Sequence, residues 1–233
     1  MKRMALAGLL ALPRTADPRT FDLDLPAPAA HEKRDLAELG AKAVVVTLFT
    51  MMALRMAADF LATGHVTGLL LVASEALVVI LTLFRRSAAV VDRSRRARLL
   101  TTLSMIGPPL VRPFSAPALA PETVTVMISA VGLLCVVAGK VSLGRSFGLM
   151  PANRGIVSTG LYRFVRHPIY LGYLVTHAAF VAANPAITNA LVLAIADTAL
   201  LMRAVCEERT LALDGAYRDY LQKVRWRVVP GVF

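Results

Sequence analysis

Long apolar runs separated by short polar linkers constrain this chain more than any other feature. A membrane-spanning helix needs roughly 20 mainly apolar residues, or about 17 at the short end. Six segments are long enough, or paired closely enough with a neighbour, to sit in a bilayer. They are 40–62, 67–84, 99–111, 122–139, 169–183 and 186–202. The sequence therefore predicts an all-α polytopic integral membrane protein with about six transmembrane helices.

Two proline-containing motifs affect the predicted number of spans and the way the last two are connected. The third segment is short and reaches Gly107-Pro108-Pro109, which is expected to break or end a helix, so five spans is the alternative. Asn184-Pro185 separates the last two segments and is typical of a tight turn. We therefore expect segments 169–183 and 186–202 to form an antiparallel hairpin.

The composition and the placement of charges favour the same fold. Of all residues, 57% are hydrophobic and 18% charged, against about 25% charged in a typical soluble domain. The apolar content excludes a disordered chain. The net charge is +11, and nearly all Lys and Arg residues lie in 1–42, 85–98, 140–169 and 203–233. Six helices with both termini in the cytoplasm place every basic cluster on the cytoplasmic side. The predicted partner of this charge is a lipid bilayer, not nucleic acid.

The chain divides into three predicted regions. Residues 1–38 are polar and contain proline, and no signal-peptide cleavage pattern follows their short apolar stretch, so they read as a cytoplasmic tail. Residues 39–139 contain the first four apolar segments, and 140–233 contain the hairpin and a basic C-terminal segment. Cys135 and Cys206 are too few for a disulfide framework. The four histidines are scattered without the spacing of metal ligands, so no metal site is predicted.

A group of polar residues lies where the fifth apolar segment begins. Pro168 suits the first turn of a helix, which places His167 just before the helix. The unpaired N–H groups of a first turn favour an anion. His167, Tyr170 and Tyr173 add hydrogen-bond donors and ring faces at this end. This end could hold a carboxylate or a nucleotide-like ligand, although an aromatic and basic anchor at the membrane interface is the simpler alternative.

A second polar group lies at the end of the sixth apolar segment. Arg203 and Glu207 are four residues apart and share a helix face. One cation and one carboxylate can hold a zwitterion such as an amino-acid group, whereas an ordinary ion pair is the alternative. Because the hairpin turns back at Asn184-Pro185, we expect this face to lie beside His167. The two faces would then form one pocket at the membrane–cytoplasm boundary.

Three further groups have structural and functional interpretations. Residues 217–227 are basic and aromatic, and either cover this pocket or bind anionic lipid headgroups, the latter being favoured for most of them. Arg55, Asp59 and Glu75 lie inside apolar segments, where charges mark transport pathways by default, but mutual neutralisation is favoured here. His177 is expected to be a hydrogen-bonded core residue.

The region around the pocket resembles a known family. Residues 143–147 read Leu-Gly-Arg-Ser-Phe, and 155–172 read Gly-Ile-Val-Ser-Thr-Gly-Leu-Tyr-Arg-Phe-Val-Arg-His-Pro-Ile-Tyr-Leu-Gly. Residues 207–211 read Glu-Glu-Arg-Thr-Leu, followed by Gly-Ala-Tyr-Arg-Asp-Tyr at 215–220. This pattern, over about residues 140–230, resembles the isoprenylcysteine carboxyl methyltransferase group. It is similar, more loosely, to phospholipid methyltransferases and membrane sterol reductases.

The resemblance implies an integral-membrane methyltransferase that uses S-adenosylmethionine and a lipophilic acceptor entering from the bilayer. By motif, His167 and Tyr170 would contact the cofactor, with Tyr162 and Tyr173 beside them and Glu207 on the facing helix. Arg203 would orient an acceptor carboxylate, and Glu208 is the adjacent acid. An amine or thiol acceptor would instead need proton removal, with His167 or Glu208 as the candidates. Arg203 and Glu208 are therefore the predicted catalytic residues.

The sequence leaves several hypotheses about function open. The preferred acceptor is a carboxylate of prenylcysteine type, and a phospholipid, amine or thiol acceptor is the first alternative. A nicotinamide-dependent reductase would need more spans than this chain offers, and a non-enzymatic membrane protein is the third possibility. The predicted location is the inner membrane of a bacterium.

Overall fold

The computed structural model describes positions 39–40, 43, 46–47, 49–51, 53–54, 57–58 and 61, and then residues 66–112 and 117–233. The predicted N-terminal tail lies outside the described residues, as does much of the first predicted span. Arg55, Asp59 and the side chain of Glu75 also lie outside them, so their predicted pairing stays a prediction.

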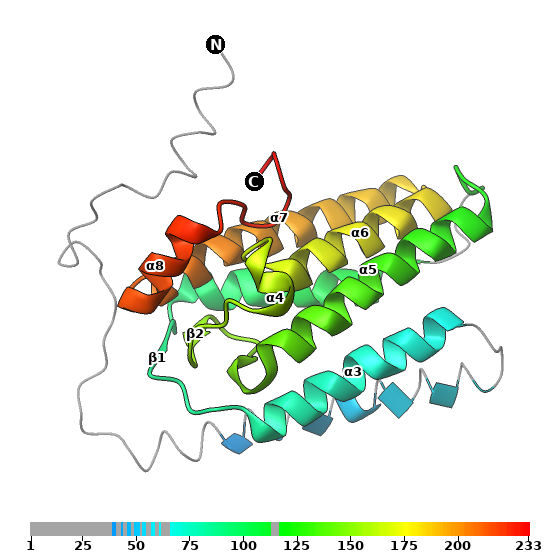
Figure 1. The fold of residues 1–233 in the computed structure, drawn as a ribbon. Helices are drawn as coiled ribbons and strands as arrows, with labels where there is room; N and C mark the ends of the chain where they lie inside the picture. Colours follow the sequence, from blue (N-terminus) through cyan, green and yellow to red (C-terminus); the bar gives the residue numbers. More distant parts are fainter. Residues whose placement is uncertain are drawn as a thin grey trace.

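The described part of the chain is mainly helical (Figure 1). Its helices are α3 (Val66–Phe84), α4 (Arg95–Leu110), α5 (Glu122–Leu143), α6 (Pro168–Ala183), α7 (Ile187–Leu211) and α8 (Gly215–Lys223), with short 3-10 helices η2 (Gly144–Ser146) and η3 (Gly160–Arg163). Two strands of two residues, β1 (Val90–Val91) and β2 (Ala152–Asn153), pair antiparallel. They depart slightly from the all-α prediction, and they tie the α3–α4 linker to the loop that follows α5.

Each predicted apolar segment from 67 onward lies within a helix to within one residue at its ends. In the described residues, two helices are long and apolar enough to cross a membrane, Glu122–Ser146 and Ile187–Leu211, and the shorter Pro168–Ala183 is apolar as well. The number of six spans remains a prediction. The predicted break at Gly107-Pro108-Pro109 is confirmed as a helix end, but both prolines lie inside the last turn of α4, which ends at Leu110.

Close approach of helix backbones holds α5 against α6. A Cβ on Gly172 of α6 would lie 2.6 Å from the carbonyl oxygen of Gly132 of α5. A Cβ on Gly139 would lie 2.7 Å from the side chain of Ile169. Neither position has room for a larger residue without a shift of the helices. Small residues at such contacts are typical of helix packing in membranes.

The hairpin of α6 and α7 is closed as predicted. Asn184 ends α6 by donating its backbone N–H to Phe180, and α7 begins at Ile187. The Asn189 side chain accepts from the backbone N–H of Arg112 and donates to its carbonyl oxygen, both at 2.9 Å. The C-terminal end of α4 is thereby fixed to the start of α7. Figure 1 shows α5, α6 and α7 running side by side, with α8 at the end where α6 begins.

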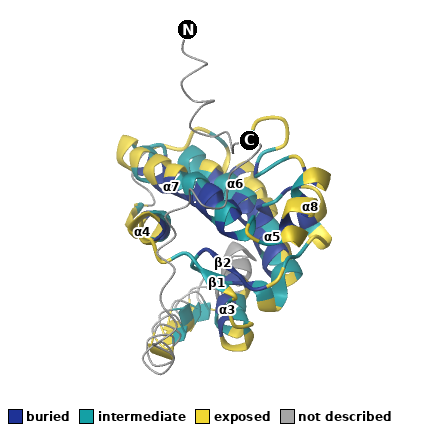
Figure 2. Cartoon of the chain, turned by 90° about the vertical axis from the view of Figure 1, so that its left-hand side faces the viewer, coloured by how far each residue is buried: buried dark blue, intermediate teal, exposed yellow. Residues whose placement is uncertain are grey.

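The outward faces of these helices are apolar. Met127, Val131 and Leu134 on successive turns of α5 are 65%, 63% and 54% exposed. Figure 2 shows buried residues gathered where α5, α6 and α7 meet and exposed residues on the outer sides. Contiguous apolar surface of this kind is unusual in water but suits a hydrocarbon environment.

Candidate cofactor-binding site

A cavity of about 230 Å³ lies between α4, α6 and α7. Its walls also include residues from η3, α8 and the loop that contains β2. Six of the seven predicted site residues line it, namely Tyr162, His167, Tyr170, Tyr173, Arg203 and Glu207. The elements that meet here are far apart in the sequence, and the α6–α7 hairpin brings them together.

The first turn of α6 presents aromatic rings to the cavity. His167 is the residue before the helix and Pro168 is its first residue, as the sequence predicts. The rings of His167 and Tyr170 stack with centroids 5.1 Å apart and an angle of 16° between their planes. Tyr173 and His177 continue the same face, with ring centroids 6.3 Å apart. Spacings of three and four residues place all four rings on one side of the helix.

The facing side of α7 carries the charged residues. The Tyr170 hydroxyl donates to the Glu207 carboxylate at 2.7 Å. The Arg203 guanidinium lies 5.4 Å from the centroid of the Tyr170 ring, within the range of a cation–π contact. The prediction that the hairpin joins the two polar groups in one pocket is therefore confirmed.

Within the described part of the chain, the buried Arg203 guanidinium keeps one nitrogen without a hydrogen-bond partner. Only 7% of the residue is exposed, and one terminal nitrogen donates to the carbonyl oxygen of Leu149. Its Nε is buried and has no hydrogen-bond partner among the described residues. No ion pair joins Arg203 to Glu207 in this part of the chain, contrary to the simpler alternative from the sequence. A buried donor without a partner costs about 1–3 kcal/mol, so this nitrogen is suited to an anionic ligand.

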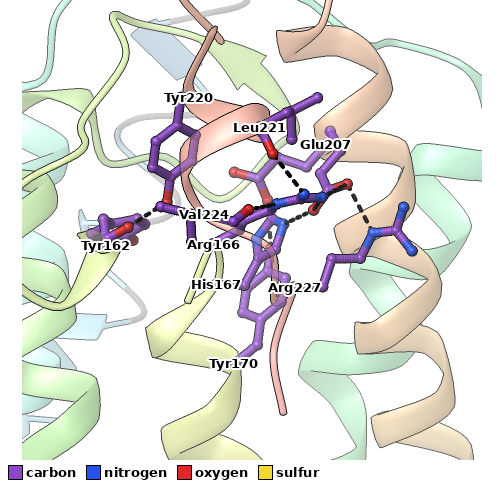
Figure 3. A network of polar contacts seen from close by, with 10 residues as sticks. Tyr162, Arg166, His167, Tyr170, Glu207, Tyr220, Leu221, Val224 and Arg227 are labelled. Atoms are coloured by element: carbon purple, nitrogen blue, oxygen red, sulfur yellow. Dashed lines mark hydrogen bonds and ion pairs between the residues drawn. The ribbon is translucent and has the colours of Figure 1, made fainter. Parts of the chain in front are cut away.

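Glu208, which the sequence predicts to be a catalytic residue, does not face the cavity. Its carboxylate is fully buried and does not line the cavity. It binds Arg227 Nε at 2.8 Å and lies 3.3 Å from both Arg166 Nη1 and His167 Nε2 (Figure 3). Successive residues of a helix point about 100° apart, so Glu208 can point to its three partners while Glu207 lines the cavity. The structure corrects the prediction for Glu208, which holds His167 and the C-terminal segment in place.

Helix α8 closes one side of the cavity. Tyr217 and Tyr220 are buried and line it, and the Tyr220 hydroxyl donates to the carbonyl oxygen of Tyr162 at 2.6 Å (Figure 3). These two tyrosines follow the first alternative from the sequence, covering the pocket, while binding of lipid headgroups stays a prediction for most of residues 217–227. Their spacing of three residues on one helix face was the signal in the sequence.

Burial keeps the tyrosines of this wall protonated. It raises the pKa of Tyr162 well above the usual value, and the Glu207 carboxylate adds to the effect. It also raises the pKa of Tyr217 and Tyr220, again reinforced by a nearby carboxylate, that of Glu208. All three phenols are therefore hydrogen-bond donors at neutral pH.

Two other groups at the cavity were not predicted as site residues. Arg166 lines it and also donates to the backbone carbonyl oxygens of Val224 and Leu221. His177 and Asp197 line it further along α6 and α7 and are hydrogen-bonded to each other at 2.6 Å. The sequence predicts His177 to be hydrogen-bonded, which is confirmed, but gives no signal for its partner, which is 20 residues away.

Comparison with known proteins finds a family that is similar to the segment forming this site. The sequence model of the Isoprenylcysteine carboxyl methyltransferase (ICMT) family matches residues 123–213. No curated protein matches the chain. The matched stretch contains α6, α7, the connection before them and all seven predicted site residues. The resemblance seen in the sequence is thus confirmed over residues 123–213, which are similar to the isoprenylcysteine carboxyl methyltransferase family, a family of membrane-bound methyltransferases.

Proposed function

We propose that this protein is a membrane methyltransferase that transfers a methyl group from S-adenosylmethionine to a lipophilic acceptor, with a carboxylate as the preferred acceptor group. The family match supports methyl transfer. The observation that carries the cofactor assignment is the buried Arg203 with an unpaired Nε beside the Glu207 carboxylate.

The chemistry of the cavity fits this cofactor. S-adenosylmethionine carries a carboxylate, an ammonium group, a sulfonium and an adenine ring. Arg203 supplies a cation for a carboxylate, and Glu207 supplies a carboxylate for an ammonium group. The stacked rings of His167 and Tyr170, with Tyr173 beside them, offer faces to a cation or to a planar base.

The protein's own part in the reaction is to bind, orient and exclude water. When bound, S-adenosylmethionine supplies an electrophilic methyl group. A carboxylate acceptor is already a nucleophile, so positioning and desolvation supply most of the rate enhancement. Arg203 binds the cofactor carboxylate through Nε. Tyr170 fixes the direction of Glu207, and Tyr217 and Tyr220 cover the cavity on the side of α8.

An amine or thiol acceptor is the second candidate, and it requires a proton acceptor. Of the two predicted proton acceptors, Glu208 is bound by Arg166, Arg227 and His167 and lies outside the cavity, and Nε2 of His167 already lies 3.3 Å from that carboxylate. This observation favours the carboxylate. We also place the cavity on the cytoplasmic side of a bacterial inner membrane, in a chain with about six spans, and the acceptor reaches it from the bilayer.

Calorimetric titration of the detergent-solubilised full chain with S-adenosylhomocysteine tests the cofactor assignment. We expect saturable binding by the wild type and a loss of at least tenfold in affinity for Arg203→Ala, since a hydrogen bond to a charged group contributes about 1.5–3 kcal/mol. NADPH serves as the comparison ligand for the reductase alternative.

A matched control separates a binding defect from unfolding. Arg209→Ala removes an arginine of the same helix that does not line the cavity, and should bind like the wild type. Unchanged binding by Arg203→Ala, or binding of NADPH in place of S-adenosylhomocysteine, would contradict the proposal.

A further inference from the structure

The pair of His177 and Asp197 forms a second polar group on the cavity wall, away from the proposed cofactor site. Nδ1 of His177 lies 2.6 Å from Oδ1 of Asp197. The His177 side chain is 12% exposed and that of Asp197 is 24% exposed. Both residues belong to the apolar hairpin, where an ionisable side chain is costly and usually functional.

The hydrogen bond within the pair leaves two atoms for a ligand. A carboxylate only accepts, so Nδ1 of His177 carries the shared proton. Among the described residues, neither Nε2 of His177 nor Oδ2 of Asp197 makes a further hydrogen bond, and neither is a fully enclosed atom. With a neutral imidazole, Nε2 is an acceptor as well. The pair therefore presents two acceptors to the cavity.

Helix α4 brings two prolines to the same cavity. Pro108 and Pro109 have no N–H and so donate no backbone hydrogen bond there. Both line the cavity together with His177 and Asp197. The backbone of α4 therefore supplies no donor to the pair at these two positions.

The pair lies along α7 from the two charged residues of the proposed cofactor site. Asp197 and Arg203 lie on the same helix, six residues apart, which corresponds to about 9 Å along its axis. Glu207 is about 15 Å away by the same measure. At these separations the pair does not touch a group held at Arg203 or Glu207, and it meets the body of an acceptor bound in the same cavity.

We propose that the His177–Asp197 pair recognises a hydrogen-bond donor, a hydroxyl or an amine, on the lipophilic body of the methyl acceptor. This inference rests on the proposed function and specifies its substrate class. A purely hydrocarbon tail would leave Nε2 of His177 and Oδ2 of Asp197 without partners, at a cost for each unsatisfied group. The preferred acceptor is therefore an oxygenated or amine-bearing lipid and not a plain isoprenyl chain.

A pair of matched fatty acids tests this inference. The probes are decanoate and the same acid with a hydroxyl near its free end, titrated into the full chain in detergent with saturating S-adenosylhomocysteine. We expect the wild type to prefer the hydroxylated acid by on the order of tenfold, the range for a hydrogen bond to a charged group. We expect the double variant His177→Phe, Asp197→Leu to bind both acids equally, because it removes the two acceptors together.

Controls separate the possible failures. Thr198→Val changes a neighbouring residue that is exposed and does not line this cavity, and it should keep the preference. S-adenosylhomocysteine binding reports whether each variant is folded, and the wild-type preference is measured without any variant. Equal or absent binding of the two acids by a wild type that binds S-adenosylhomocysteine would overturn this inference alone. A wild type that does not bind S-adenosylhomocysteine would overturn the proposed function and the inference together.

Discussion

The substitution Glu208→Ala separates the structural carboxylate from the cavity carboxylate next to it. Glu208 is completely buried and is surrounded by Arg227, Arg166 and His167 at 2.8–3.3 Å. Glu207, one residue earlier, lines the cavity and accepts one hydrogen bond from Tyr170. Removing each carboxylate in turn should therefore have different consequences for stability and for binding.

The expected loss of stability follows from the charges left behind. Removing one partner of a buried ion pair costs about 3–5 kcal/mol, because the remaining charge is buried without compensation. In Glu208→Ala, Arg227 Nε loses its acceptor, while Arg166 keeps the carbonyl oxygens of Val224 and Leu221. For Glu207→Ala one hydrogen bond is lost, which corresponds to about 1 kcal/mol.

Thermal unfolding of both variants in the same detergent measures this difference. We expect the Tm of Glu208→Ala to fall by about 6–20 °C and that of Glu207→Ala by about 2–4 °C, using the usual scaling for a chain of this size. Binding of S-adenosylhomocysteine should fall in Glu207→Ala measured below its Tm. The isosteric variant Glu208→Gln should lie between the wild type and Glu208→Ala in stability.

Equal losses of stability in the two variants would contradict the structural role of Glu208. A Glu208→Ala variant as stable as the wild type would also contradict it, because the buried carboxylate would then not stabilise the contacts with Arg227, Arg166 and His167. Normal ligand binding by Glu207→Ala would show that the cavity carboxylate does not contribute to the cofactor site.

Two further predictions concern packing and pH. Gly172→Val should destabilise the protein by about 1–3 kcal/mol, since its Cβ would meet the Gly132 carbonyl oxygen at 2.6 Å, and a Tm equal to that of the wild type would refute the close contact. Asp214 caps α8 by accepting from the Ala216 N–H at 2.9 Å, so Asp214→Ala should cost about 0.5–2 kcal/mol at pH 7. Hydrogen bonds from Asn153 and Ala216 lower the pKa of Asp214. The wild-type advantage should therefore persist above the usual carboxyl pKa and shrink as the pH falls through the lowered value, and an advantage that grows in acid would contradict this.

The hairpin at the centre of the site was predictable from local signals. Pro168 and Asn184-Pro185 mark where α6 begins and where it turns back, and both act through the backbone alone. The i,i+4 spacing of Arg203 and Glu207 fixes a common helix face whatever the tertiary structure. Together these signals place the two polar faces side by side before any packing is known.

The role of Glu208 was not predictable in the same way. A motif with two adjacent acids does not reveal which one faces the cavity, because that depends on the rotation of α7 against its neighbours. Arg227, which binds Glu208, is 19 residues away and comes from a segment without regular structure. The partners of His177 and Tyr220 are likewise distant in the sequence, so no local pattern encodes them.

The end of α4 was predictable from the sequence, but its contact with α7 was not. The sequence predicts that Gly107-Pro108-Pro109 ends a helix, and the helix does end one residue later. It gives no indication that a Cβ on Gly107 would collide with the Ala196 side chain on α7. That close approach brings α4 onto the cavity wall.

An experimental structure of the full chain with saturating S-adenosylhomocysteine tests the central claim most directly. We predict density for the ligand in the cavity between α6 and α7, with its amino-acid end within hydrogen-bond distance of Arg203 or Glu207. Density at another site, or an unfilled cavity in a crystal or particle that binds the ligand elsewhere, would contradict the proposed cofactor site.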